Sequence, residues 1–324
     1  MSLSYGVYFI QTVDNVPRAL AWGDTLNKTD VVTLAAKWPW GPAPVRNTEV
    51  FRELWLVEPL STGSATCTIR NLKNGKNMIL QDEDSIILGD SAMHLSEQWN
   101  IVPCGEQIRS AGGSQAYRIS PANSEGAFSF GVESLGYTDP TGRDIVLKRQ
   151  CQPWIFQRLS RSGGEIHEVV SQSWSTNDSV PEIFISYQSD TEYLILSRGL
   201  WSLIWKEYHE HGFMSNVWGD IPEQRQWRPE IYDCDDFATV FKVVVVIWGE
   251  KNIRVDGVAI LCGVMLGQPR PRVEGGAHAY NFTLSDEDSN DPADENRRIQ
   301  YFQAEVGRFD NDEGYHYYPV AAYF

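Results

Sequence analysis

The chain has 324 residues and a formal net charge of -16, and this length predicts about two domains, each able to bury a hydrophobic core. The charge is concentrated in the second half: residues 1–160 contain 14 Lys+Arg and 16 Asp+Glu, whereas residues 161–324 contain 13 and 27. An acidic second half argues against nucleic acid or an anionic membrane as a partner and leaves room for cations such as calcium. An acidic face that keeps the protein soluble is the simpler explanation of most of this charge.

The cysteines and the N-terminus bear on the cellular compartment. The cysteines are few, scattered and odd in number, so they predict neither a disulfide framework nor a paired metal spacing; they are Cys67, Cys104, Cys151, Cys234 and Cys262. No basic segment with an apolar core opens the chain, and no apolar run approaches the roughly 18 residues of a transmembrane helix. We therefore expect a cytoplasmic protein with free thiols and no transmembrane segment.

Residues 5 to about 160 consist of short apolar runs separated by turn residues, a pattern that predicts an all-β region. Three of these runs place a polar residue two positions before a tryptophan, at Glu53-Leu-Trp55, Glu97-Gln-Trp99 and Gln152-Pro-Trp154. Recurrence at intervals of roughly 45–55 residues indicates three copies of one supersecondary unit. Three such units around a pseudo-threefold axis would bury the three tryptophans in one core.

This pattern resembles the ricin-B-like β-trefoil lectins, whose repeats each end in Gln-x-Trp. The resemblance implies that a repeat competent for sugar binding presents an aspartate, which accepts hydrogen bonds from galactose hydroxyls. The matching positions in this chain are expected to be Ala21, Ile79 and Phe130. An apolar residue cannot replace a carboxylate in this role, so all three sites depart from the family pattern.

The first repeat keeps an aromatic-rich loop that contains Trp38 and Trp40, with Asn47 beyond it. Exposed tryptophan faces are a usual platform for sugar rings, and they serve as often as packing lids. Two alternatives stay open: a sugar site in this loop, or a trefoil retained as a scaffold with changed or lost specificity.

The amino-acid composition changes near residue 160. Gly163-Gly164 is expected to be a break, and residues 160–190 are rich in Ser, Thr, Asn and Asp. We therefore predict two domains, 1–160 and 161–324. Beyond the boundary, residues 191–208 are expected to begin extended and to become helical.

Cys234 precedes a predicted helix. The apolar residues that follow it recur with helical spacing, at Phe237, Val240, Phe241, Val244, Val245 and Trp248. Asp235 and Asp236 fall in the first turn, where carboxylates favour the helix dipole, and Gly249 is the expected stop. Backbone N–H groups at a helix N-terminus lower a thiol pKa, so Cys234 is a candidate reactive cysteine. On this stretch alone, a structural cysteine at a helix cap is an equally good interpretation.

Two predicted strands supply possible partners for this thiol. Alternation over residues 277–284 places His278, Tyr280 and Phe282 on one face, and Gln303 and Glu305 are expected to share a face of the following strand, 299–306. A cysteine at a helix start, a histidine on a strand and a polar group on the next strand follow the order that a thiol hydrolase needs. Order alone is weak support. Cys262, in an apolar run, is most simply a core thiol.

Three segments, residues 231–238, 260–267 and 277–284, closely resemble the mushroom chimerolectins, which join a β-trefoil to a papain-like domain. The resemblance implies an all-β (β-trefoil) N-terminal domain and an α+β papain-like C-terminal domain that forms a homodimer and acts as a calcium-dependent cysteine protease. Cys234 becomes the nucleophile and His278 the general base. Asp235 and Asp236 become candidate calcium ligands, at a site where Mn²⁺ can replace Ca²⁺. Clustered carboxylates suit such a cation.

The third catalytic position departs from the family. Where the family has Phe-Glu-Pro-Gln, this chain has Phe302-Gln-Ala-Glu305, so the acid and the amide have exchanged places. Gln303 can still orient the imidazole through its carbonyl oxygen, although more weakly than an acid, and Glu305 would add a charge near the metal. Three outcomes stay open: Gln303 orients the base, Glu305 swings in, or the domain is a damaged hydrolase kept for binding.

From these features we predict a fungal chimerolectin used in defence, with calcium-dependent cysteine protease activity on peptides or proteins. Any glycan bound by its trefoil is expected to contain galactose. The alternative is a glycan-binding or scaffold protein with a vestigial, inactive protease domain.

Overall fold

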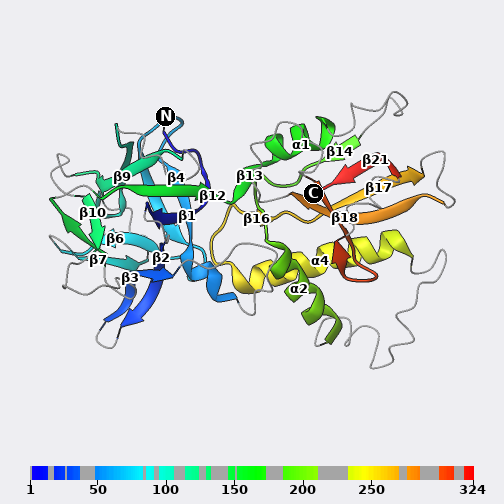
Figure 1. Ribbon diagram of the computed structural model, residues 1–324, viewed down its shortest axis with the longest axis horizontal. Coiled ribbons are helices and arrows are strands. Elements are labelled where there is room, and N and C mark those ends of the chain that lie inside the picture. The colour runs from blue at the N-terminus through cyan, green and yellow to red at the C-terminus, as the bar shows by residue number, and fades with distance from the viewer. Residues whose placement is uncertain are drawn as a thin grey trace. The chain divides into compact units, whose positions relative to one another are not determined.

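The computed structural model describes residues 2–13, 18–25, 28–36, 48–82, 85–90, 95–105, 114–123, 129–132, 145–149, 152–172, 185–210, 233–269, 276–284, 299–309 and 317–324. The chain divides into two compact units (Figure 1). Among the described residues, unit 1 comprises those up to Leu159 together with Asn252–Asp256, and unit 2 comprises the others from Ser160 to Phe324. Within the described ranges, no helix has both the length and the apolar character to cross a membrane.

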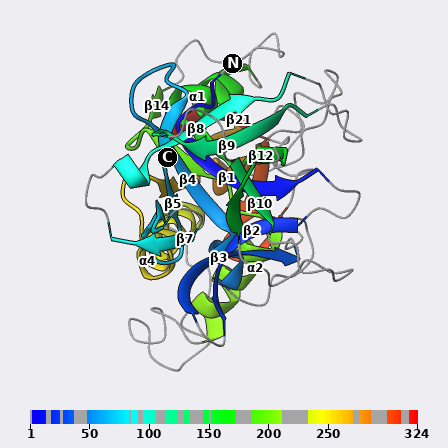
Figure 2. The ribbon, with the colours of Figure 1, turned by 90° about the vertical axis from the view of Figure 1, so that its left-hand side faces the viewer.

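Six strands of unit 1 form a closed barrel, because β1 pairs with β12 as well as with β4. In barrel order they are β1 (Gly6–Thr12), β4 (Leu54–Pro59), β5 (Thr66–Asn71), β8 (Trp99–Pro103), β9 (Ala116–Pro121) and β12 (Trp154–Arg158). Figure 2 turns these strands toward the viewer. Two short 3-10 helices, η1 (Thr48–Glu53) and η2 (Leu95–Glu97), lie before β4 and β8.

Each repeat of unit 1 adds a two-stranded hairpin to its share of the barrel. The hairpins are β2 (Arg18–Thr25) with β3 (Lys28–Ala36), β6 (Asn77–Leu80) with β7 (Ile86–Gly89), and β10 (Ser129–Val132) with β11 (Ile145–Lys148). A closed six-stranded barrel with three hairpins is a β-trefoil, so the predicted fold of the first half is confirmed.

The three repeated tryptophans explain why the sequence adopts this fold. Trp55, Trp99 and Trp154 are fully buried in a single hydrophobic cluster. The indole Nε1 of Trp55 donates to the carbonyl oxygen of Leu20 at 2.9 Å, and that of Trp99 donates to Met78 at 3.0 Å. Each of these two tryptophans therefore joins a barrel strand to the hairpin of its own repeat.

Unit 2 contains helices and a six-stranded sheet, an α+β arrangement. The helices are α1 (Gly163–Gln172), α2 (Arg198–Glu210) and α4 (Cys234–Asn252). The sheet has the order β14 (Ile185–Tyr187), β21 (Tyr317–Tyr323), β17 (Gly263–Pro269), β18 (His278–Leu284), β19 (Ile299–Gln303) and β20 (Arg308–Phe309). A smaller sheet contains β13 (Ser160–Ser162), β15 (Glu192–Leu194) and β16 (Ala259–Ile260).

The large sheet of unit 2 is covered on both faces. On one face, Ile166 and Val170 of α1 pack in a cluster with Tyr280 and Phe282 of β18. On the other face, Ala238 of α4 packs against Val264 and Ala279. Alternation along β18 therefore decides which side chains reach α4.

Three local predictions about unit 2 are wrong. Gly163 begins α1 rather than a break, because Ser162 and Glu165 form a reciprocal capping box: Ser162 N–H donates to Glu165 Oε2 at 2.6 Å, and Glu165 N–H donates to Ser162 Oγ at 3.2 Å. Helix α4 continues through Gly249 to Asn252. Strand β19 ends at Gln303, so Glu305 lies in a turn and does not share a strand face with Gln303.

Candidate functional site

Cys234 is the first residue of α4 and faces β18. Asp233 precedes the helix, and its carbonyl oxygen accepts the N–H of Phe237 at 3.0 Å. The Cys234 side chain packs against the cluster that contains Ala238 and Ala279, and its sulfur accepts the N–H of Ala279 at 3.4 Å. The start of α4 therefore places the Cys234 thiol beside Ala279, the residue that follows His278 in the sequence.

The surroundings of Cys234 raise the pKa of its thiol. Burial is the largest cause, the hydrogen bond from Ala279 opposes it, and the negative charges of Asp233, Asp235 and Glu305 raise the pKa further. The raised pKa runs against the lowering that a helix N-terminus favours, because desolvation and three carboxylates outweigh the hydrogen bond from Ala279.

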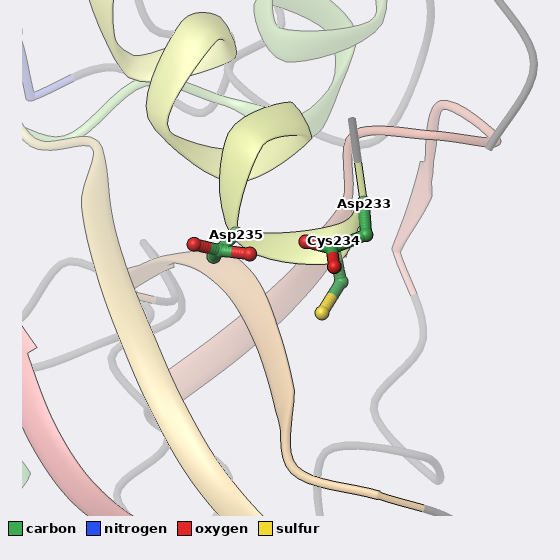
Figure 3. A group of neighbouring side chains, drawn as sticks. All are labelled: Asp233, Cys234 and Asp235. Atoms are coloured by element: carbon green, nitrogen blue, oxygen red, sulfur yellow. The ribbon is translucent and has the colours of Figure 1, made fainter. Parts of the chain in front are cut away.

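Asp233, Cys234 and Asp235 form a compact acidic group at the first turn of α4 (Figure 3). One ligand atom from each residue lies within 4.8 Å of the others. A hydrogen bond with Asp233 is the main reason that the pKa of the Asp235 carboxyl is raised, followed by desolvation. Sequence reasoning missed Asp233; its position just before the helix start, as the capping residue, was the available signal.

The other two expected metal ligands lie in different settings. The Asp236 carboxylate accepts the N–H of Asp233 at 3.3 Å and so caps the helix. Glu305 lies in the turn after β19, and its charge acts on Cys234. Asp235 is the one residue of the expected set that belongs to the compact acidic group in the described part of the chain.

Two carboxylates held close together fit a hard cation. The charge of Asp233 is one of the causes that raise the pKa of Asp235, and a bound divalent cation would offset the repulsion between the two carboxylates. The thiol between them is a poor ligand for calcium, which prefers oxygen. Asp233 and Asp235 are therefore the residues of this site that would hold calcium.

The ring of His278 lies near two tyrosine rings. His278 begins β18, and its ring centroid is 5.7 Å from that of Tyr280 and 5.1 Å from that of Tyr317. Both tyrosines belong to the face covered by α1, whereas Cys234 packs on the opposite face with Ala279. No hydrogen bond joins the two side chains among the residues that the structure describes. Burial lowers the pKa of His278, so the imidazole favours its neutral form.

The two candidates for the third catalytic position lie at the end of β19. Gln303 is buried, and its backbone carbonyl oxygen accepts the N–H of Gly307 at 2.8 Å. The backbone thus turns sharply just after Gln303 and carries Glu305 within it. The structure brings Cys234 against the backbone of β18, and among the described residues no hydrogen bond joins the His278 ring to the thiol.

Cys262 has the role expected of it. It is almost fully buried between β16 and β17, and burial raises the pKa of its thiol to about 12. The amide nitrogen of Asn281 donates to its sulfur at 3.6 Å. Cys262 is a core thiol.

In unit 1, the strand register of the three hairpins shows which residues of the three repeats are equivalent, including the positions where the lectin family carries its aspartate. Leu20, Met78 and Phe130 are fully buried members of the same core cluster, one in the first strand of each hairpin. Each faces a leucine across its hairpin, the pairs being Leu20 with Leu34, Met78 with Leu88 and Phe130 with Leu147. These three residues are structurally equivalent.

The position that follows each of them is therefore the equivalent of the missing aspartate: Ala21, Ile79 and Gly131. The prediction of Phe130 for the third repeat is wrong by one residue, because Phe130 points into the core, edge-on to Trp99 at a centroid distance of 4.7 Å. None of the three positions carries a carboxylate. Trp38, Trp40 and Asn47 lie outside the described residues.

Comparison with known proteins places these features in context. The family model described as Agglutinin C-terminal matches residues 193–309, which include Cys234, His278 and Glu305. A structure of Polyporus squamosus lectin bound to the human-type influenza-binding epitope Neu5Aca2-6Galb1-4GlcNAc matches with 27% identity and a TM-score of 0.71, and covers 100% of both chains. The chain is similar to a mushroom lectin over its whole length.

A second structure, the PSL1a-E64 complex, matches with 27% identity and a TM-score of 0.68, again over 100% of both chains. No curated protein matches the chain. The family model and the two structures support a relation to a mushroom lectin family.

Proposed function

We propose that the chain is a glycan-binding protein of the ricin-B-like lectin type. Its full-length similarity to a lectin bound to a sialylated, galactose-containing trisaccharide carries this proposal, and the β-trefoil of unit 1 supports it. Because Ala21, Ile79 and Gly131 cannot accept hydrogen bonds through a side-chain carboxylate, binding depends on other residues. Trp38, Trp40 and Asn47 of the first repeat are the proposed contacts.

A glycan array tests this function. Purified protein is expected to bind galactose-containing glycans, and a Trp38→Ala/Trp40→Ala variant is expected to lose that binding. Tyr187→Ala is a matched control, since Tyr187 is a 68% exposed aromatic residue of unit 2. Binding to no glycan at micromolar protein would reject the lectin function and favour a trefoil that acts only as a scaffold.

A second function, cysteine protease activity in a papain-like unit 2, is proposed from the place of Cys234 at the start of α4 beside β18. One matched structure is a complex of a relative with E64. Cys234 is the nucleophile and His278 the base, with Gln303 or Glu305 as the orienting group. Calcium, with Mn²⁺ as a substitute, is held by Asp233 and Asp235. A homodimer formed through unit 2, a cytoplasmic location and a role in fungal defence complete the proposal.

The chemistry follows from these positions. His278 turns from Tyr280 and Tyr317 toward the thiol and accepts its proton as the Cys234 sulfur attacks the peptide carbonyl. Backbone N–H groups of the first turn of α4 stabilise the oxyanion. The proton then passes from His278 to the leaving amine, and water hydrolyses the acyl-enzyme with His278 as base.

Casein cleavage in millimolar calcium measures this activity. Cys234→Ala is expected to abolish it, and Cys262→Ala, which removes the buried core thiol, is the control expected to retain it. If the wild-type protein cleaves neither casein nor itself, unit 2 is a vestigial protease and the glycan-binding function stands alone.

A further inference from the structure

Helix α4 is joined to strand β18 by a second hydrogen bond, close to the one that Cys234 makes. The side-chain amide nitrogen of Asn281 donates to the backbone carbonyl oxygen of Ala238 at 2.9 Å. Ala238 lies about one helical turn after Cys234. Asn281 follows Ala279 in β18, and the N–H of Ala279 donates to the Cys234 sulfur at 3.4 Å. Two hydrogen bonds therefore join the same helix to the same strand, one at the thiol and one a turn further along.

The two hydrogen bonds are spaced similarly on the helix and on the strand. One turn of an α-helix advances about 5.4 Å, and two residues of a strand advance about 6.7 Å. Side chains two positions apart on a strand point to the same face, so Asn281 lies on the face of β18 on which Ala279 packs against Ala238. Together the two bonds fix where along β18 the start of α4 lies.

Asn281 is fully buried, and its neighbours determine the orientation of its amide. Its nitrogen also lies 3.4 Å from the carbonyl oxygen of Gly263 and 3.6 Å from the sulfur of Cys262. Carbonyl oxygens only accept hydrogen bonds, so the donating nitrogen has to face the carbonyls of Ala238 and Gly263. One amide group therefore joins α4 to β18 and to the adjacent strand β17, and a side chain without N–H groups cannot replace it.

We propose that Asn281 is a positioning residue, which holds the first turns of α4 against β18 and thereby keeps the Cys234 sulfur at the N–H of Ala279. The inference rests on the thiol site proposed above. Asn281 acts through the backbone of α4, since its hydrogen bond to the helix is made at Ala238. Leucine branches at the same carbon as asparagine and has a similar size, so Asn281→Leu keeps the shape and removes the amide.

Amide hydrogen exchange followed by NMR tests this role in the full-length protein, because the N–H of Ala279 is the donor to the thiol. Cys234→Ala removes the acceptor and is expected to raise the exchange rate of the Ala279 amide about five-fold, the factor that a net hydrogen bond contributes. Asn281→Leu is expected to raise this rate to a similar extent. The double variant is expected to exchange at Ala279 no faster than Cys234→Ala alone.

Thr283→Val is the matched control. Thr283 is a buried residue of β18 on the same face as Asn281, and its hydroxyl has no hydrogen-bond partner in the described part of the chain. Valine has the same shape, so this variant changes a buried polar group of β18 and is expected to leave the Ala279 rate unchanged. The amides of Phe282 and Leu284 report the overall stability of β18, and each Ala279 rate is divided by theirs to remove any general loss of stability.

An unchanged relative rate at Ala279 in Asn281→Leu, with a raised one in Cys234→Ala, overturns the proposal. An unchanged rate in Cys234→Ala also overturns it, because the thiol is then not held at Ala279. The same follows if Thr283→Val raises the rate as much as Asn281→Leu does. If NMR spectra show that Asn281→Leu does not fold, Asn281→Ser, which shortens the side chain and removes the amide, decides by the same readout.

Casein cleavage gives a second, separate readout. In protein that cleaves casein, Asn281→Leu is expected to lower kcat about ten-fold and to leave KM unchanged, because a displaced nucleophile weakens the transition state and not the binding of substrate. An unchanged kcat overturns the positioning role. Absent cleavage by wild-type protein rejects the protease function instead, and the exchange rates at Ala279 still judge the role of Asn281.

Discussion

The three trefoil tryptophans are equivalent by position but not by hydrogen bonding, and this difference predicts unequal costs for one substitution. Trp99 Nε1 donates to Met78, whereas the buried Nε1 of Trp154 has no hydrogen-bond partner in the described structure. Replacing Trp99 by Phe removes the bond, leaves the buried Met78 carbonyl unsatisfied and opens a small cavity. Replacing Trp154 by Phe opens a similar cavity but removes a donor that was already unsatisfied.

The cavity costs are expected to be similar, so the hydrogen bond decides the difference. A net hydrogen bond contributes about 1 kcal/mol, and a buried group left unpaired costs about 1–3 kcal/mol. Trp99→Phe is therefore expected to destabilise unit 1 by about 1–2 kcal/mol more than Trp154→Phe. Trp55→Phe is expected to match Trp99→Phe, because Trp55 donates to Leu20.

Hydrogen exchange followed by mass spectrometry measures this in the full-length protein, since the opening free energy of amides in β4, β8 and β12 reports on unit 1 without two-state unfolding of the whole chain. Equal losses of protection in Trp99→Phe and Trp154→Phe would refute the reasoning. A larger loss in Trp154→Phe would show that its indole is bonded in solution.

Further predictions concern unit 2. Gly263→Ala places a Cβ 2.0 Å from the Phe282 ring and is expected to cost about 1–3 kcal/mol of unfolding free energy, whereas Gly276→Ala, with no atom within 4 Å of the new Cβ, is expected to be almost neutral; urea denaturation compares the two. Ser162→Ala is expected to cost about 1 kcal/mol in the same assay, through loss of the α1 cap. Burial lowers the pKa of His278 below its ordinary 6.5. As the pH falls below 6.5, the unfolded state therefore binds a proton before the folded state does, and the free energy of unfolding decreases until the pH reaches the folded-state pKa. His278→Gln is expected to flatten this part of the pH–stability curve. A slope of the pH–stability curve that His278→Gln leaves unchanged would contradict the lowered pKa of His278. A Ser162→Ala variant as stable as wild type would contradict the capping role of Ser162.

The trefoil was predictable because its signal repeats. Trp55, Trp99 and Trp154 mark equivalent places in three units, and burial of a large aromatic residue at each leaves few other architectures. The register of the third hairpin was not predictable to one residue, because Phe130 and Gly131 both fit an apolar alternation until the core cluster shows which one points inward.

The helix and strands that carry the candidate site were predictable from the sequence, but the arrangement of their side chains was not. Periodicity after Cys234 indicated the helix, and alternation placed His278 with Tyr280. The direction of the His278 ring depends on Tyr317, a residue far along the chain, and the acid group depends on Asp233, which local patterns treat as a cap. Glu305 was misplaced because β19 ends in a turn that Trp205 stabilises, a contact across about a hundred residues of sequence.

The barrel of unit 1 and the large sheet of unit 2 differ in how they end. The barrel of unit 1 closes on itself through β1 and β12, so its ring of strands has no free edge. The described strands at the two sides of the large sheet in unit 2 are short, three residues in β14 and two in β20. Edge strands of this length offer few unpaired backbone groups to another chain. The closed barrel and the short edge strands of the large sheet therefore both limit strand-to-strand aggregation.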